Sequence, residues 1–231
     1  KGRQRDVIDL YRMPWPIRGS YRFRQNWHYD PSGQSRQQTM DHMMGVLEAL
    51  GEAVKAGRIR AIGMSNESAW GMTKWVDQAE AAGLPRMASV QNEYSLLCRL
   101  YDTDMAEMAV NEDVTLLSFS PLAAGLLTGK YQNGQVPEGS RMAINGDLGG
   151  RKSPRVFAAT QAYLDVATKH GLDPVHMSMA WQRTRPFPVS AIFGATTSDQ
   201  LKQILAGQDV VLSGDIVADI DAAHMAHPMP Y

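Results

Sequence analysis

The feature that most constrains the fold is an alternation of short apolar runs with longer amphipathic segments, which occurs five times along the 231 residues. Runs typical of buried strands lie at residues 7–11, 59–65, 87–91, 114–120 and 189–193. Segments with apolar residues at helical spacing follow them at residues 39–56, 68–82, 104–110, 154–170, 174–185, 199–206 and 213–225. This alternation predicts an α/β fold with a parallel sheet, and it predicts that ligands bind in loops at the carboxyl ends of the strands.

Composition and charge exclude several classes of protein. Hydrophobic residues make up 44% of the chain and charged residues 20%, which is typical of a globular protein with an apolar core. The formal net charge of −1 argues against a general binder of nucleic acid or anionic membranes. Cys98 is the only cysteine, so an internal disulfide is excluded, and His224 and His227 without a third ligand predict no metal site. No apolar run approaches the roughly 20 residues that cross a bilayer and no signal peptide is visible, so we expect a cytoplasmic protein.

Two long loops interrupt the pattern, at about residues 17–38 and 121–153. Loops of this length in a compact domain are more often functional than idle. The first is rich in Arg, Tyr and Trp, and we interpret it as a flexible active-site wall rather than as a nucleic-acid patch. Asn66 stands where a helix N-cap belongs, and Asp173 followed by Pro174 predicts the start of another helix.

The residues from Phe119 to Tyr131 join a buried strand to a glycine-containing loop. Glycine lets backbone N–H groups approach a phosphate because it has no Cβ in the way, and Lys130 adds a positive charge. Three residues separate Gly125 from Gly129, and Tyr131 follows the lysine, so the loop is not a Walker A motif. From these residues alone two interpretations remain open, a phosphate site and an ordinary connection between a strand and a loop.

A Rossmann site is disfavoured, because no Gly-x-Gly-x-x-Gly motif follows any of the strands. The strand ends carry five other signatures, in this order: Asp9-Leu10-Tyr11 with Trp15-Pro16; Gly63-Met64-Ser65-Asn66; Gln91-Asn92-Glu93-Tyr94-Ser95; Phe119-Ser120-Pro121-Leu122 through Gly129-Lys130-Tyr131; and Gly194-Ala195-Thr196 with Gln200-Leu201. Together they resemble the aldo-keto reductases, and most closely the bacterial members related to potassium-channel β-subunits. The resemblance covers nearly the whole chain.

The resemblance implies a fold, a cofactor and a set of site residues. The fold is the (β/α)8 TIM barrel, of which residues 1–231 form a single partial domain with roughly strands 4–8 and their helices. The cofactor is NADP(H), bound without a Rossmann motif, and a pair of cations near its 2′-phosphate favours NADPH over NADH. The implied residues are Ser65, Asn66 and Gln91 for the nicotinamide carboxamide; Phe119 for stacking under the nicotinamide ring; Ser120, Pro121, Leu122, Ala123 and Ala124 for the pyrophosphate; Lys130, Arg141, Thr196 and Gln200, with Gly194 in the same segment, for the 2′-phosphate; and Gln203 for the adenine.

The sequence departs from the family pattern at the catalytic residues. The family's tetrad is Asp, Tyr, Lys and His, and the first three belong to βα units that the resemblance places before Lys1. Pro14 stands at the position of the His and has neither a donor nor a titratable group, so no catalytic residue is expected in this chain. Ile204 replaces a frequent Asn near the adenine.

A barrel with five of its eight strands has unpaired edges. We therefore expect the isolated chain to aggregate, to form a homo-oligomer or to pair with a missing N-terminal segment.

The function implied by the resemblance is the NADPH-dependent reduction of aldehydes or ketones, with a small-molecule carbonyl substrate and neither a nucleic-acid nor a membrane partner. Two alternatives stay open. One is a module that binds NADP(H) and senses its redox state without turnover, as a channel β-subunit does, and the other is an inactive fragment. They stay open because the catalytic residues of the family pattern are not found in this chain.

Overall fold

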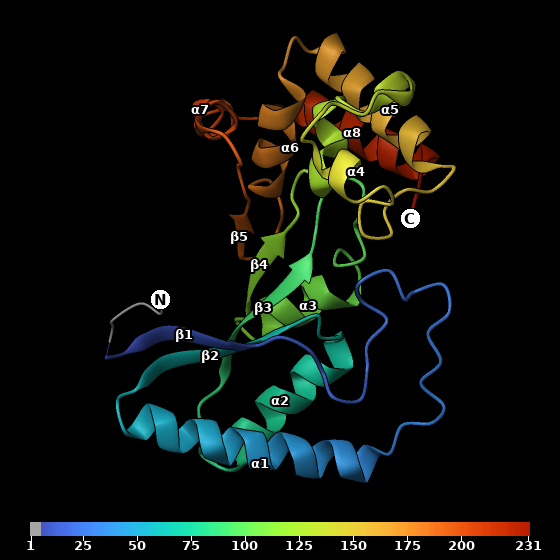
Figure 1. Cartoon of the computed structure of the whole chain (residues 1–231). Helices are drawn as coiled ribbons and strands as arrows, with labels where there is room; N and C mark the ends of the chain where they lie inside the picture. The colour runs from blue at the N-terminus through green and yellow to red at the C-terminus, as the bar shows by residue number, and fades with distance from the viewer. Residues whose placement is uncertain (1–5) are drawn as a thin grey trace. The chain divides into compact units, whose positions relative to one another are not determined.

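The computed structural model describes residues 6–231, and its strands and helices follow one another in the expected order (Figure 1). The described chain divides into two compact units. The first contains the residues up to Asn92 together with Thr103–Leu117, and the second contains Glu93–Asp102 and Ser118–Tyr231. Five strands are hydrogen-bonded in chain order, β1-β2-β3-β4-β5, and the two pairs β1/β2 and β2/β3 are parallel. The predicted α/β fold with a parallel sheet is confirmed.

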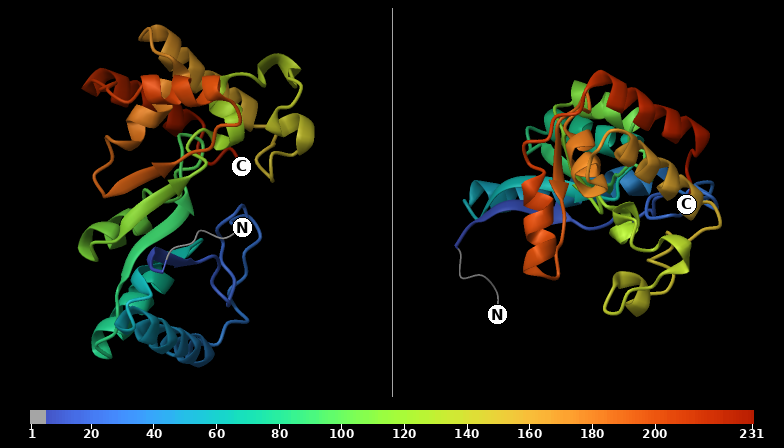
Figure 2. Two further views of the ribbon diagram at one scale, coloured as in Figure 1. Left: turned by 60° about the vertical axis from the view of Figure 1, so that its left-hand side comes forward. Right: turned by 90° about the horizontal axis from the view of Figure 1, so that it is seen from above.

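Apart from the first residues of β4, the first unit is built from three strands and three helices. The strands are β1 (Ile8–Met13), β2 (Ile59–Ser65) and β3 (Met87–Glu93), and the helices are α1 (Arg36–Lys55), α2 (Ala69–Ala81) and α3 (Asp104–Asn111). Helices α1 and α2 lie side by side under β1 and β2 (Figures 1 and 2). The interior between them is filled by apolar side chains that are almost completely buried, including Leu47, Ile62, Met72 and Trp75. Burial of such side chains is the main source of stability in an α/β layer.

Most of the second unit follows β4 (Thr115–Phe119), and it contains most of the helices. Its elements are η1 (Ala123–Thr128), η2 (Gln132–Gly134), α4 (Arg141–Ile144), α5 (Val156–Lys169), α6 (Pro174–Gln182), β5 (Val189–Ile192), α7 (Ser198–Ala206) and α8 (Gly214–Ala226). Helix α5 packs against α6 and α8, as the upper part of Figure 1 shows. Tyr94 stacks on Trp181 in the core, with 5.1 Å between the ring centroids. Aromatic stacking of this kind adds to the burial of both rings.

Several helix ends differ from the expectation, because local caps decide them. Helix α1 begins three residues earlier than predicted, since the Ser35 side chain accepts a hydrogen bond from the Gln38 amide. The prediction that Asn66 caps the second helix was wrong. Ser68 caps α2, since its hydroxyl accepts from the Gly71 amide at 3.2 Å. Asn66 lies before the cap and has a φ of 57°. The predicted cap Asp173 is confirmed, with its side chain accepting from the amide of Val175. Serine and asparagine are similarly good caps, so the sequence could not rank them.

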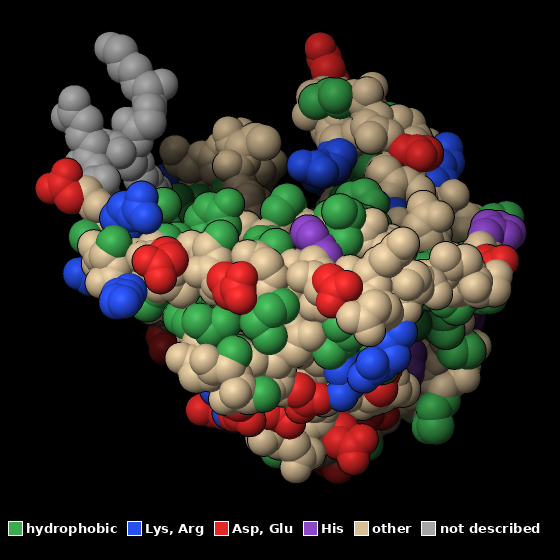
Figure 3. All heavy atoms as spheres, turned by 90° about the horizontal axis from the view of Figure 1, so that it is seen from below, with side chains coloured by type: hydrophobic (Ala, Val, Ile, Leu, Met, Phe, Trp, Pro, Cys, Tyr) green, Lys and Arg blue, Asp and Glu red, His purple; other side chains and the backbone are tan. Residues whose placement is uncertain are grey.

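The second long loop is not structureless. It contains the short helices η1, η2 and α4, each only one or two turns long. Within the described chain no helix combines the length and the apolar character needed to span a bilayer. On the face drawn in Figure 3, acidic and basic side chains stand close to one another among hydrophobic ones.

Candidate functional site

In the first unit, the ends of β2 and β3 bring three of the predicted residues together. Ser65 and Gln91 are register partners in the parallel pair β2/β3. The Ser65 hydroxyl donates to the Gln91 carbonyl oxygen at 2.9 Å, and the Asn66 amide donates to the same oxygen at 2.9 Å. Neighbouring parallel strands end at the same edge of a sheet, which is why residues 25 and more positions apart meet here. The three residues predicted to hold a carboxamide therefore form one cluster.

The Asn66 side chain has one group with a partner and one without. Its Nδ2 donates to the carbonyl oxygen of Pro14 at 3.1 Å. Its Oδ1 is buried and has no hydrogen-bond partner among the described residues. A buried acceptor without a donor costs about 1–3 kcal/mol, so a donor supplied by a ligand or a water would be favourable here. An amide N–H is the kind of donor that this oxygen fits.

In the second unit, the chain leaves β4 through a turn with an unusual backbone. Ser120, Ala123 and Ala124 have φ values of 54°, 48° and 57°, and Gly125 has 94°. The turn is closed by two hydrogen bonds, from the Ala123 amide to the Ser120 carbonyl at 2.8 Å and from the Gly125 amide to the Leu122 carbonyl at 2.9 Å. A left-handed conformation costs a non-glycine residue about 1–2 kcal/mol, and strain of this kind concentrates at functional sites. Three of the five residues predicted to wrap a pyrophosphate, Ser120, Ala123 and Ala124, are thus held in a conformation that non-glycine residues disfavour.

Lys130 lies against this turn. A Cβ added to Gly125 would stand 2.8 Å from Lys130 Cε and 3.0 Å from its Nζ, so a larger residue here would push the lysine side chain aside. The ammonium also lies over the Tyr131 ring, 5.2 Å from its centroid. Lys130 is half-buried, in contrast to a freely solvated loop cation. The predicted phosphate turn and the predicted cation therefore meet in the structure.

Tyr131 connects the same turn to the helix that carries Arg141. Its hydroxyl, in an almost fully buried side chain, donates to the Ala124 carbonyl at 3.5 Å and accepts from the Met142 amide at 3.3 Å. Arg141 is the first residue of α4 and is exposed. One tyrosine thereby links the turn and Lys130 to the short helix that begins at Arg141.

The last predicted segment follows β5. Gly194 is exposed, and the Thr196 amide and hydroxyl both donate to the Gln200 Oε1, at 2.9 and 3.0 Å. The Gln203 side chain binds the N-cap residue of α6, since its Nε2 donates to Asp173 Oδ2 at 2.9 Å. A contact between Gln203 and an adenine would have to compete with this bond. Thr196 and Gln200 thus form a pair, whereas Gln203 supports the start of α6.

Comparison with known proteins settles the family. The sequence model described as "Aldo/keto reductase family" matches residues 2–224, which is nearly the whole chain. The chain belongs to the aldo/keto reductase family. The resemblance drawn from the strand-end signatures is thereby confirmed.

The relatives of this aldo/keto reductase chain are longer than it is. It is 39% identical over 230 residues to "Protein tas" of Escherichia coli K12, covering 98% of this chain and 64% of the relative. It is 31% identical over 188 residues to the "L-glyceraldehyde 3-phosphate reductase" of Escherichia coli O157:H7, covering 78% of this chain and 53% of that protein. The solved structure of a glycerol dehydrogenase from Gluconobacter oxydans aligns with a TM-score of 0.69 at 21% identity, over 97% of this chain and 60% of that one. The structural likeness confirms the barrel-family α/β fold, and the chain spans less than two thirds of the length of these relatives.

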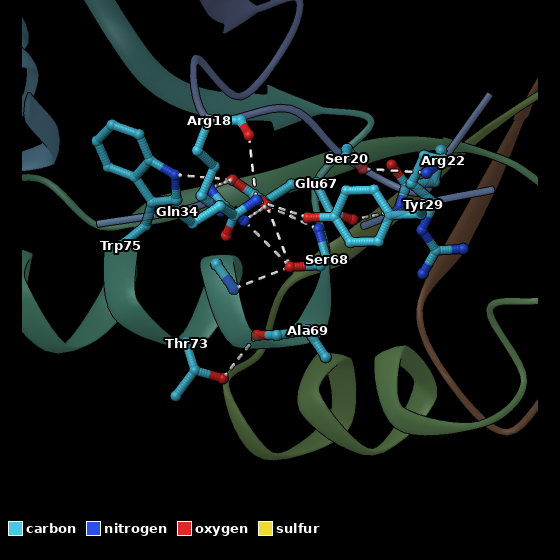
Figure 4. Close-up of polar contacts among 12 residues, drawn as sticks. Arg18, Ser20, Arg22, Tyr29, Gln34, Glu67, Ser68, Ala69, Thr73 and Trp75 are labelled. Carbon is cyan, nitrogen blue, oxygen red and sulfur yellow. Dashed lines mark hydrogen bonds and ion pairs between the residues drawn. The ribbon is translucent and has the colours of Figure 1, made fainter. Parts of the chain in front are cut away.

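Sequence reasoning missed two buried ion pairs in this aldo/keto reductase chain. In the second unit, Arg151 Nε donates to Glu93 Oε1 at 2.7 Å. In the first unit, Arg18 forms an ion pair with Glu67, whose side chain is fully buried (Figure 4). Both glutamates stand at or just after the end of a strand. A glutamate next to a buried strand is expected to be buried, and a buried charge needs a charged partner. This position in the sequence was the signal that could have predicted the two pairs.

The Arg18–Glu67 pair holds part of the first long loop in place. Arg18 also donates to the Ser68 hydroxyl at 3.1 Å and lies 5.0 Å from the centre of the Trp70 ring. Gln34 Nε2 donates to the Arg18 carbonyl at 3.1 Å. The loop predicted as a flexible wall is therefore fastened to the start of α2 at this point. His28, which lies in the same loop, is exposed to solvent.

The side chains of the described residues form no group of three or more His, Cys, Asp and Glu that could hold a metal. His224 lies in α8, and burial, followed by the nearby Arg99 charge, lowers the pKa of its imidazole. The lowered pKa favours the neutral imidazole near neutral pH.

Proposed function

We propose that this chain takes part in the NADP(H)-dependent reduction of an aldehyde or ketone. The observation that carries the proposal is the buried Asn66 Oδ1, which lacks a partner among the described residues and lies in the cluster formed by Ser65, Asn66 and Gln91. A carboxamide both donates and accepts, and these side chains offer both kinds of partner. The family membership adds that the chain comes from a group of oxidoreductases.

The residues of the second unit fit the phosphate part of such a cofactor. Three successive residues of the turn, Ala123, Ala124 and Gly125, have left-handed backbones, a geometry of the kind found in turns that bind anions. Lys130 supplies a positive charge against the turn, and Arg141 supplies a second one that is open to solvent. Two cations favour a cofactor with an additional phosphate, hence NADPH over NADH.

When bound, the cofactor would supply a hydride to the carbonyl carbon. Ser65, Asn66 and Gln91 would orient the carboxamide, and Phe119 is the residue that we propose for stacking on the nicotinamide. Pro14 offers only its backbone carbonyl, which already accepts from Asn66 Nδ2. Pro14 therefore positions Asn66 in this proposal and transfers no proton.

The substrate in this proposal is a small carbonyl compound. One relative is named for the reduction of L-glyceraldehyde 3-phosphate, an aldehyde. An aldehyde of similar size is therefore the first substrate to test, together with a generic aromatic aldehyde.

The test is a titration with NADPH followed by tryptophan fluorescence. We expect Asn66→Ala to weaken NADPH binding about tenfold, because the carboxamide loses its acceptor. Asn133→Ala is the matched control, since Asn133 has the same backbone conformation, with φ of 58° against 57° for Asn66, and lies in η2. Equal affinities for the two variants would contradict the carboxamide role of Asn66.

Addition of an aldehyde to the NADPH complex then separates the enzymatic function from its alternatives. Oxidation of the cofactor, followed by its absorbance, supports the reductase. Binding without turnover supports a redox-sensing module. If the wild-type chain does not bind NADPH at all, the proposed function is wrong.

A further inference from the structure

The guanidinium of Arg151 is buried and uses all three of its nitrogens. Nε donates to Glu93 Oε1 at 2.7 Å, Nη1 donates to the Leu148 carbonyl at 2.8 Å, and Nη2 donates to the Ser120 hydroxyl at 3.1 Å. The side chains of Arg151 and Glu93 are each 5% exposed. A buried charge is tolerated only when it is paired and hydrogen-bonded, and this one is both.

Two of the three acceptors lie at the ends of neighbouring strands. Glu93 is the last residue of β3, and Ser120 is the first residue after β4. The two ends are adjacent, since the Tyr94 amide donates to the Phe119 carbonyl at 3.3 Å. Arg151 itself comes from the far end of the second long loop. It therefore ties that loop to both strand ends at once.

The glutamate that holds Arg151 is fixed in turn by Tyr231. The Tyr231 hydroxyl donates to Glu93 Oε1 at 3.2 Å, and the Ser153 hydroxyl donates to the Pro230 carbonyl. Burial, reinforced by the Glu93 carboxylate, raises the pKa of Tyr231 well above its usual value. The hydroxyl is therefore protonated at neutral pH and remains a donor.

We propose that Arg151 is a positioning residue for the dinucleotide, acting through Ser120. The inference rests on the proposed function, in which the turn beginning at Ser120 holds the pyrophosphate. Ser120 has a φ of 54°, a conformation that needs support from outside the turn. Arg151 supplies this support from its buried position. A lysine could not replace it, because an ammonium lacks the planar fork that reaches three acceptors.

The decisive variant is Arg151→Lys, with Lys152→Ala as its matched control. Lys152 is the adjacent cation and is exposed. We expect Arg151→Lys to raise the Kd for NADPH about tenfold and Lys152→Ala to leave it unchanged. We also expect the ratio of the NADH and NADPH dissociation constants to stay as in the wild type, because Arg151 orders the turn and does not contact the 2′-phosphate. A changed ratio would overturn the positioning role in favour of direct contact with the cofactor.

A double-mutant cycle with Ser120→Ala separates positioning from a general structural role. If Arg151 acts through Ser120, adding Arg151→Lys to Ser120→Ala raises the Kd by much less than Arg151→Lys alone does. If the two effects multiply, the proposal is wrong. Should Arg151→Lys fail to fold, Tyr231→Phe provides a milder test, since it removes only the donor to Glu93. A smaller rise in Kd supports the proposal, and an unchanged Kd overturns it.

The failures of the two proposals can be told apart. Wild-type protein that binds NADPH, together with an Arg151→Lys variant of equal affinity, overturns only the role of Arg151. Wild-type protein that does not bind NADPH overturns the proposed function and the positioning role with it.

Discussion

The two units carry the same chemical device, a buried arginine–glutamate pair that fastens a long loop. In the first unit, Arg18 from the loop after β1 pairs with Glu67, and the side chains are 7% and 0% exposed. In the second unit, Arg151 from the loop after β4 pairs with Glu93, with both side chains 5% exposed. In each unit the glutamate lies at or just beyond the end of a strand.

The two ion pairs differ in the further groups to which they are hydrogen-bonded. Glu67 also accepts from the Ser68 amide at 2.7 Å and from Trp75 Nε1 at 3.2 Å, so its remaining bonds go to the start of α2 and to the core (Figure 4). Arg151 instead reaches Ser120, the first residue of the candidate phosphate turn. One pair therefore stabilises a helix start and its core, whereas the other supports a candidate binding site. The two pairs are alike in burial and charge. Their roles are distinguished by the additional group that each pair is bonded to.

The largest effect is expected from Glu67→Gln, which leaves Arg18 buried without a counter-charge. We expect the free energy of unfolding to fall by about 3 kcal/mol or more, because breaking a buried pair by changing one partner is strongly destabilising. The control is Glu80→Gln, since Glu80 pairs with Arg86 at the surface and both side chains are more than 40% exposed. That control should cost less than about 1 kcal/mol. Urea denaturation measures both, and equal losses would show that the first pair contributes no more than a surface pair.

The next effect concerns cofactor affinity and compares two glycines of the second unit. Gly125→Ala introduces a Cβ that meets Lys130, at a position with φ of 94°. Gly134→Ala is the control, because Gly134 has φ of 74° but nothing within 4 Å of the added Cβ. Both variants strain the backbone, and only the first displaces Lys130.

We therefore expect Gly125→Ala to weaken NADPH binding about tenfold more than Gly134→Ala does, with a smaller difference for NADH. Titration with both cofactors measures this. A similar loss for the two glycine variants would mean that the position of Lys130 does not matter for the phosphate.

The smallest effect is a pH dependence that belongs to the second unit. Burial, and next the charge of Arg99, lowers the pKa of His224, while Asp102 and Asp221 oppose the shift and Arg185 adds to it. The unfolded chain therefore binds a proton at His224 more readily than the folded chain. Stability should fall as the pH decreases through the unfolded value of about 6.5.

Urea denaturation at about pH 7.5 and pH 5.5 tests this, with His224→Gln as the variant. The wild type should lose more stability than the variant between the two pH values. His28→Gln is a suitable control, because His28 is exposed and lies in the first unit. An identical pH dependence for the wild type and His224→Gln would contradict the prediction.

Much of the fold was predictable because the apolar period is a local property. Strand β2 was expected at residues 59–65 and occupies Ile59–Ser65, and the cap at Asp173 before Pro174 was correct. The cap of α2 was not, since Asn66 and Ser68 are both good caps and only the path of the chain after β2 decides between them. Helix ends depend on which of several adequate local contacts the rest of the fold permits.

The candidate site was predictable in part. The signatures at the strand ends identified Ser65, Asn66 and Gln91, and the structure brings them together. The sequence also predicted a positive charge from Lys130 at the glycine-containing loop, and the structure places its side chain beside Gly125. The Arg151–Glu93 pair was not, because the two residues are 58 positions apart and each looks like an ordinary polar residue on its own.

By itself, the sequence determined the order of strands and helices, the family and the residues at the strand ends, because these follow from local patterns along the chain. Only the tertiary structure decided which buried charges pair, which Asn66 oxygen lacks a partner and which residue supports the turn at Ser120. These features depend on distances between groups that are remote in sequence, and no local pattern encodes such distances.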